Sequence, residues 1–157
     1  MRRGPRLAVG GPAAPDATPA PAAVSLPAST WAAILEHCRR GLPNEACGII
    51  AGDAGWSRGG RALRWLPARN ALASPYRFAL DEDVLVRLTL RIDDAGEAIW
   101  AVVHSHVASP AVPSPTDLRD WRYEDALQLI VSMASSPVLR AWRLVDGRPS
   151  ELPVIQH

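Results

Sequence analysis

The spacing of apolar side chains along the chain predicts helices in three places. Between residues 31 and 40, apolar residues recur every three or four positions and so share one helix face: Trp31, Ile34, Leu35 and Cys38. The same spacing follows Asp81, which can begin a helix that ends near residues 93–96: Val84, Leu85, Leu88 and Ile92. Ser114-Pro115-Thr116-Asp117 is typical of a helix start, because serine caps a helix and proline suits its first turn.

Runs of apolar residues between these helices predict strands. The runs at 46–52 and 98–105 are short and almost wholly apolar, which is typical of buried central strands. Further strands are expected at 61–68, 127–133 and 138–145, the last two as a hairpin. The order α-β-β-α-β-α-β-β predicts an α/β (α+β) fold, a single domain with a mixed central sheet flanked by helices.

The first 26 residues differ in composition from the rest of the chain. They are rich in Pro, Ala and Gly and contain few large apolar side chains. Such a segment cannot bury enough apolar surface to offset the entropy that is lost on ordering. We therefore expect a disordered tail over residues 1–26 and a folded domain over residues 27–157.

Composition and charge exclude several classes of function. All 17 basic residues are Arg, so neither a Schiff-base lysine nor a P-loop lysine is present, and the net charge of +1 gives no sign of a nucleic-acid partner. No apolar run approaches the ~20 residues of a membrane-spanning helix. The two cysteines cannot form a disulfide framework. We expect a cytoplasmic protein without a nucleic-acid or membrane partner, its oligomeric state left open.

One pair of histidines carries the strongest chemical signal. His104 and His106 end an expected strand, where residues two apart point to the same face. Asp117 follows after a loop long enough to fold back toward them. Two imidazoles and a carboxylate fill three positions of a tetrahedral zinc site and leave the fourth for water, as in catalytic zinc sites. The alternative is that the histidines are structural or exposed and that Asp117 only completes a capping box with Ser114.

Two more side chains suit hydrolysis at such a site. Glu45 precedes a buried strand and can take a proton from water as a general base. Ser114 can donate its hydroxyl to the oxyanion that forms on an attacked carbonyl. The alternative for Glu45 is a solvated turn residue, and Cys47 is expected to be a small core residue rather than a nucleophile.

Together these residues resemble the motif of the JAMM metalloproteases, the catalytic members of the MPN-domain superfamily. The match comprises Pro43-Asn44-Glu45-Ala46-Cys47-Gly48 and, downstream, His104-Ser105-His106 with Ser114 and Asp117 at the family's spacing. The resemblance implies one zinc ion per chain, with these roles: His104, His106 and Asp117 as ligands, Glu45 as acid/base, and Ser114 as support for the tetrahedral intermediate. Val107 stands where many members have proline, which leaves the stiffness of this loop and the leaving-group preference open.

Residues 70–78 and 142–147 resemble a small bacterial branch of that family, the sulfur-carrier-protein–cysteine peptidases. Members of that branch hydrolyse the amide between the C-terminal glycine of a small ubiquitin-like sulfur carrier and an attached cysteine. The resemblance implies a β-grasp partner with a Gly-Gly tail, which can bind as an added strand beside a sheet edge. Arg77 is a candidate for holding the carboxylate of the leaving cysteine. Its alternative role is an ion pair with a surface acid such as Asp81.

Two other functions fit part of the pattern. A non-catalytic MPN-like binding domain would keep the fold, but such members typically lack one or more of the site residues, and all of them are present here. A nucleobase deaminase needs H-x-E and P-C-x-x-C motifs, and neither occurs. The sequence therefore predicts a hydrolase, a zinc-dependent peptidase or isopeptidase.

Overall fold

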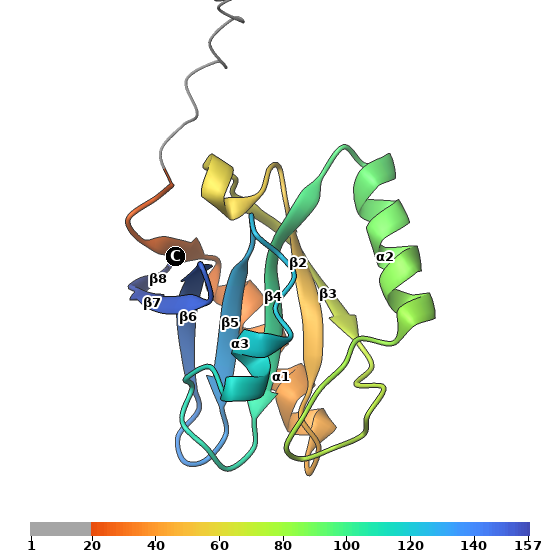
Figure 1. Ribbon diagram of the computed structural model, residues 1–157, viewed down its shortest axis with the longest axis vertical. Helices are drawn as coiled ribbons and strands as arrows, with labels where there is room; N and C mark the ends of the chain where they lie inside the picture. The colour runs from red at the N-terminus through yellow and green to blue at the C-terminus, as the bar shows by residue number, and fades with distance from the viewer. Residues whose placement is uncertain (1–19) are drawn as a thin grey trace, which may run out of the picture.

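Residues 20–157 are described by the computed structural model, and their main feature is a six-stranded sheet with helices on both faces (Figure 1). The strands lie in the order β3-β2-β4-β5-β6-β7: β2 (Cys47–Gly52), β3 (Ala62–Ala68), β4 (Ala98–His106), β5 (Leu127–Ser132), β6 (Val138–Val145) and β7 (Arg148–Leu152). β4 and β5 run parallel, and all other neighbours run antiparallel. The expected mixed sheet is therefore confirmed, as is the hairpin of β5 and β6.

Two helices cover opposite faces of this sheet: α1 (Ala28–Gly41) and α2 (Glu82–Asp94). Ile34 of α1 packs in the same core cluster as Ile50 of β2. Ile92 of α2 packs in a second cluster with Ile49. Adjacent residues of a strand point to opposite faces, so β2 contributes to both layers. No helix within residues 20–157 is long and apolar enough to cross a lipid bilayer.

Two short strands extend the fold beyond what the sequence predicted. β1 (Val24–Leu26) pairs in parallel with β8 (Val154–Gln156), and the side chains of Val24 and Leu26 are fully buried. The expected end of the tail at residue 26 is therefore wrong, because these two side chains belong to the hydrophobic core. The earlier part of the expected tail, residues 1–19, lies outside the described residues.

The topology brings several segments together at the C-terminal end of β4. A parallel neighbour such as β5 requires the chain to cross back over the sheet before that strand begins. This crossing segment, residues 107–126, contains the short helix α3 (Pro115–Arg119), which lies across the front of the sheet in Figure 1. The antiparallel strand β2 begins at the same end, because Cys47 pairs with His104. The short helical turn η1 (Trp56–Arg58) follows the other end of β2, where Gly52 pairs with Ala98 at the start of β4.

Candidate active site

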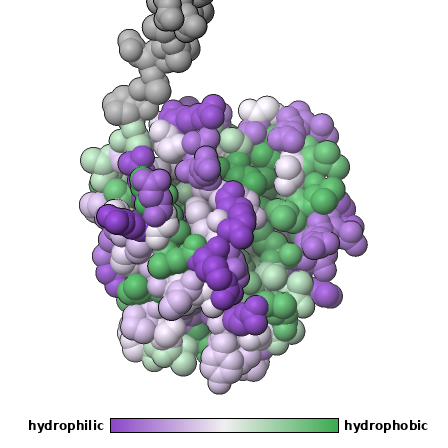
Figure 2. All heavy atoms as spheres, in the orientation of Figure 1, coloured by the Kyte–Doolittle hydropathy of each residue, from purple (hydrophilic) through white to green (hydrophobic). Residues whose placement is uncertain are grey.

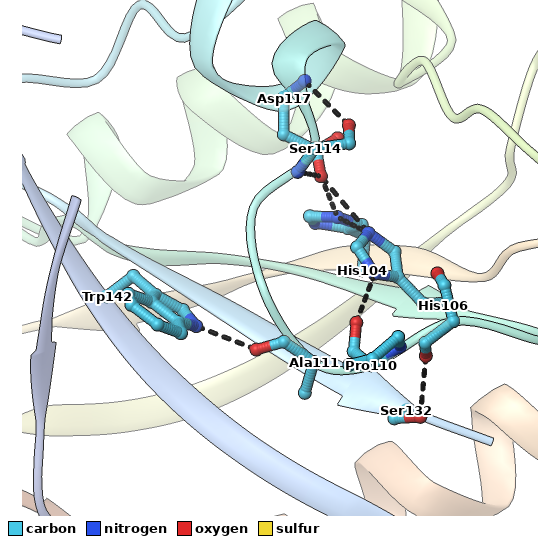
Figure 3. Close-up of polar contacts among 9 residues, drawn as sticks. His104, His106, Pro110, Ala111, Ser114, Asp117, Ser132 and Trp142 are labelled. Carbon is cyan, nitrogen blue, oxygen red and sulfur yellow. Dashed lines mark hydrogen bonds and ion pairs between the residues drawn. The ribbon is translucent and has the colours of Figure 1, made fainter. Parts of the chain in front are cut away.

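His104, His106 and Asp117 meet at the C-terminal end of β4 (Figure 3). The Nε2 atoms of the two histidines are 3.1 Å apart. The Oδ2 atom of Asp117 lies 3.2 Å from Nε2 of His104 and 3.1 Å from Nε2 of His106. All three side chains are almost fully buried. The structure thus brings together the two histidines and the carboxylate that the sequence singled out.

The spacing of these three atoms fits a metal ion better than a set of hydrogen bonds. A neutral imidazole carries one proton, so three mutually contacting acceptor atoms cannot all be satisfied by hydrogen bonds among themselves. Ligand atoms around a tetrahedral zinc ion, with bonds of about 2.0–2.1 Å, lie about 3.3 Å apart. The observed separations of 3.1 and 3.2 Å approach that value. Two nitrogens and one carboxylate oxygen are also a donor set suited to catalytic zinc.

Each imidazole is held so that its Nε2 atom faces the other two atoms. Nδ1 of His106 lies 2.8 Å from the carbonyl oxygen of Pro110, so Nδ1 donates the proton and Nε2 keeps a free lone pair. The ring of His104 stacks on Phe78, with centroids 4.3 Å apart and planes inclined by 17°. Burial lowers the pKa of His104 and so favours the neutral ring that metals require.

Asp117 is positioned by the helix that it helps to begin. Ser114 caps α3: its Oγ accepts a hydrogen bond from the N–H of Asp117 at 3.1 Å, and its own N–H donates to Oδ2 of Asp117 at 2.9 Å. Burial opposes ionisation of Asp117, but the contacts of its carboxylate with the imidazoles of His104 and His106 outweigh it and, together with the N–H of Ser114, hold its pKa below the usual value. Helix capping and metal ligation by Asp117 are therefore compatible. Since the Ser114 oxygen only accepts in this capping box, its hydroxyl proton is free for another acceptor.

Glu45 lies across the β2–β4 pair from His106. Cys47 pairs with His104, and the N–H of Ser105 donates to the carbonyl oxygen of Ala46 at 2.9 Å. One residue further along this antiparallel register, Glu45 lies opposite His106. Directly opposed residues of such a pair carry their side chains on the same face. Glu45 is 5% exposed, so it is not a solvated turn residue. Burial, partly offset by the charge of His106, raises the pKa of Glu45 to about 7, which suits a general base at neutral pH.

Asn70 ties the backbone of Glu45 to the irregular segment 70–80. Its amide nitrogen donates to the carbonyl oxygens of Glu45 and Arg77, each at 3.0 Å. Its Oδ1 atom accepts from the N–H groups of Leu72 and Ala79, each at 3.1 Å. One side chain therefore closes the loop and fastens it to the residue expected to act as base.

Neither Asn70 nor Phe78 was predicted as a site residue. Both lie in segment 70–80, where no helix or strand periodicity distinguishes inward from outward positions. The residue type offered one signal, because an asparagine side chain that accepts from the N–H two residues on is typical of a turn.

The loop that follows His106 is held firmly even though Val107 replaces proline. Figure 3 shows Nδ1 of His106 bonded to the Pro110 carbonyl and Nε1 of Trp142 bonded to the Ala111 carbonyl. The donor–acceptor distances of these two hydrogen bonds are 2.8 Å and 2.9 Å. The hydroxyl of Ser132 donates to the carbonyl of residue 109 at 2.7 Å. These bonds fasten the loop to β5 and β6, so its stiffness does not depend on a proline at position 107.

Arg77 does not pair with Asp81, whose carboxylate lies 3.8 Å from Arg69 instead. Arg77 is exposed and lines a cavity together with Asp117 and Asp120. The expected ion pair of Arg77 with Asp81 is therefore wrong, and Arg77 instead lines a cavity beside Asp117, one of the candidate metal ligands.

The two cysteines are core residues. Burial, with a smaller contribution from Glu45, raises the pKa of Cys47 to about 12, and burial raises that of Cys38 to about 11. Both thiols are free and stay protonated at neutral pH. The thiolate is the nucleophilic form, so the expectation that Cys47 serves the core is confirmed.

Comparisons with known proteins agree with this architecture. A family model described as prokaryotic homologs of the JAB domain matches residues 27–145. A CysO-cysteine peptidase of Mycobacterium tuberculosis is 37% identical over 124 residues, which is 78% of this chain and 83% of that protein. A desampylase of Haloferax volcanii is 32% identical, covering 76% of this chain and 87% of that protein. A solution structure from Desulfitobacterium hafniense superimposes with a TM-score of 0.75 at 28% identity, covering 85% of this chain and 92% of the other.

Proposed function

Because this chain belongs to the family of prokaryotic homologs of the JAB domain, we propose that it is a zinc-dependent peptidase acting on a ubiquitin-like sulfur carrier protein. It hydrolyses the amide bond that follows the carrier's C-terminal Gly-Gly and releases cysteine. The observation that carries this proposal is the mutual contact of His104, His106 and Asp117 through their metal-binding atoms, with Glu45 on the same face. The peptidase and desampylase relatives support the substrate class.

The side chains of the site divide the chemistry among them. His104, His106 and Asp117 would hold one zinc ion, and bound zinc supplies Lewis acidity, which lowers the pKa of a water molecule. Glu45 accepts the proton at its carboxylate as water attacks the carbonyl, and then donates that proton to the nitrogen of the departing amine. Burial raises the pKa of this carboxyl above its ordinary value, which makes it a stronger base than an exposed glutamate. The hydroxyl of Ser114 donates a hydrogen bond to the developing oxyanion.

The leaving group and the cellular location are finer parts of the same proposal. Arg77 binds the carboxylate of the leaving cysteine, since a planar guanidinium can hold a carboxylate through two hydrogen bonds. Its exposed position at a cavity beside Asp117 supports this role. We place the protein in the cytoplasm, because Cys38 and Cys47 are free thiols, as is usual in a reducing compartment.

The experiment is to incubate the zinc-loaded protein with three carrier conjugates and to follow the carrier's mass. The amine after Gly-Gly is cysteine, cysteine amide or a longer peptide, and Arg77→Ala is assayed beside the wild type. We expect cleavage after the final glycine, fastest with free cysteine, and loss of that preference alone in Arg77→Ala. Equal rates on all three conjugates would remove the role of Arg77 and the choice of cysteine. Binding of the carrier without cleavage would instead indicate a non-catalytic MPN-like domain.

A further inference from the structure

Ser105 stands between the two histidines on β4, and its side chain lies on the opposite face of the sheet from theirs, because adjacent residues of a strand alternate. Ala46 lies across from Ser105 and belongs to the core cluster that includes Ile34 of α1. Figure 2 shows the other face of the molecule, where hydrophilic side chains lie over α3. Ser105 is fully buried, so its hydroxyl acts only on neighbours within the chain.

The hydroxyl of Ser105 takes the place of a main-chain carbonyl where β2 meets β4. Two directly opposed residues of a hydrogen-bonded antiparallel pair exchange two N–H···O=C bonds. One of these bonds is present, because the N–H of Ser105 donates to the carbonyl of Ala46 at 2.9 Å. The N–H of Ala46 donates instead to Oγ of Ser105 at 2.8 Å. The chain therefore leaves the regular ladder just before Cys47, the first residue of β2 to pair in register.

This hydrogen bond holds one end of the peptide unit that joins Glu45 to Ala46. Ser105 accepts from the N–H of the unit, and Asn70 donates to its C=O at 3.0 Å. Rotation of the unit is therefore opposed from both sides. Because the unit is bonded directly to the Cα atom of Glu45, its orientation sets the direction in which the carboxylate leaves the backbone.

Removal of the hydroxyl would change this arrangement in a defined way. The N–H of Ala46 would then have to remain unpaired in the core or turn to the carbonyl of Ser105, as in a regular ladder. Either outcome shifts the peptide unit that carries Glu45. The hydroxyl also contacts the thiol of Cys38 on α1, so a second buried group is available to accept its proton.

We propose that Ser105 is a positioning residue of the peptidase reaction: its hydroxyl, acting through the N–H of Ala46, sets the position of the Glu45 carboxylate relative to the expected metal ligands. The inference rests on the proposed function, because it concerns the same reaction. A general base must lie within hydrogen-bond reach of the proton that it takes, about 2.6–3.2 Å. Ser105 is joined covalently to both histidines, so a single residue fixes the proposed base against two of the expected ligands.

The test is Ser105→Ala, assayed with the zinc-loaded protein and the carrier–cysteine conjugate well below the melting temperature. A displacement of about 1 Å in a reacting group can lower a rate by roughly 100-fold, so kcat should fall by about 10–100-fold with little change in KM. Zinc should stay at one ion per chain. Ser105→Thr keeps the hydroxyl and should restore most of kcat. Cys38→Ala removes one heavy atom from the same buried contact, and this matched control should leave kcat unchanged.

A combined variant distinguishes positioning of the base from a general loss of packing. If Ser105 acts through Glu45, Ser105→Ala should have little further effect on kcat in the Glu45→Gln protein, which has already lost the base. A purely structural role would lower kcat by the same factor in both backgrounds. If Ser105→Ala does not fold, Ser105→Cys replaces it in both experiments with the same expected fall in kcat, because sulfur fills a similar space and is only a weak acceptor.

Three results would overturn this inference and leave the proposed peptidase intact. They are an unchanged kcat in Ser105→Ala, an equal loss of kcat in Ser105→Thr, and a full further loss on top of Glu45→Gln. Loss of zinc from Ser105→Ala would also overturn it, because the residue would then act on the metal ligands rather than on the base. Failure of the wild type to cleave any carrier conjugate overturns both the inference and the proposed function.

Discussion

The side-chain nitrogen of Asn70 lies 3.0 Å from the main-chain oxygen of Glu45. The same nitrogen lies 3.0 Å from the main-chain oxygen of Arg77, so one amide group joins the proposed base to a wall of the cavity. The N–H of Glu45 also donates to the carbonyl of Ser74 at 2.8 Å. Both main-chain polar groups of Glu45 are thus held by segment 70–80, and the position of its carboxylate depends on that segment.

Asn70→Asp should therefore impair catalysis without removing the metal. The substituted carboxylate cannot donate to either carbonyl and repels both. A displacement of about 1 Å in a reacting group can lower a rate by roughly 100-fold, so kcat should fall by about 10–100-fold, with a higher KM because the cavity wall also shifts. Zinc content should stay at one ion per chain. Asn44→Asp makes the same chemical change beside Glu45 and is the matched control. If Asn70→Asp lowers kcat only in proportion to the folded fraction, its role is structural.

Glu45→Gln should keep zinc and lose turnover. The amide has nearly the same shape as the carboxyl group but cannot accept a proton from water. General acid–base assistance is typically worth about 10²–10⁴-fold, and kcat should fall within that range. Steady-state kinetics together with metal analysis measure both quantities. Loss of zinc along with activity would make Glu45 a metal ligand or a structural residue instead.

The raised pKa of Glu45 also predicts a pH-dependent stability of the metal-free protein. Its folded pKa of about 7 exceeds the ordinary value of 4.5, so the folded state binds the proton more tightly than the unfolded state. The protonated Glu45 therefore contributes to the free energy of unfolding. This contribution is fully present below pH 4.5 and is lost as pH rises through 7. The amide of Glu45→Gln does not titrate in this range. The free energy of unfolding of this variant minus that of the wild type should therefore increase between pH 5 and pH 8, by at most about 3 kcal/mol. Urea unfolding of both proteins at the two pH values measures this difference, and a constant difference would mean that Glu45 is not desolvated.

Ser114→Ala separates two roles of one hydroxyl. Loss of the cap on α3 should lower stability by about 0.5–2 kcal/mol, because the N–H of Asp117 loses its acceptor. Loss of an oxyanion donor should also lower kcat by about 10²–10³-fold. Measured well below the melting temperature, where the variant is fully folded, the fall in kcat cannot come from unfolding. Ser114→Thr keeps the hydroxyl and should restore both quantities, whereas full activity in Ser114→Ala would leave the residue a cap only.

Local pattern was sufficient to predict the parts of the site that lie within one regular element. The alternation of a strand places His104 and His106 on one face, and the capping pattern marks Asp117 at the start of a helix. The position of Glu45 opposite His106 depends on the register between β2 and β4, which is a property of two segments far apart in sequence. The roles of Asn70 and Phe78 depend on an irregular loop, where no periodicity applies.

The elements missed at the ends of the chain are explained by their surroundings. β7 is a polar edge strand, so it lacks the apolar run that marks a buried strand. β1 and β8 are three residues each, and each is a strand only because the other lies beside it. Val24 and Leu26 looked like part of a proline-rich tail, yet they fill the core.

The most direct measurement of the central claim is activity against added zinc. The protein is stripped with a chelator, the chelator is removed, and cleavage of the carrier–cysteine conjugate is measured as zinc is returned in fractions of an equivalent. We predict no cleavage without metal, a linear rise, and a break at one zinc per chain. His104→Ala, His106→Ala and Asp117→Ala should stay inactive at every zinc concentration. Cleavage at the full rate by the stripped protein would contradict the account.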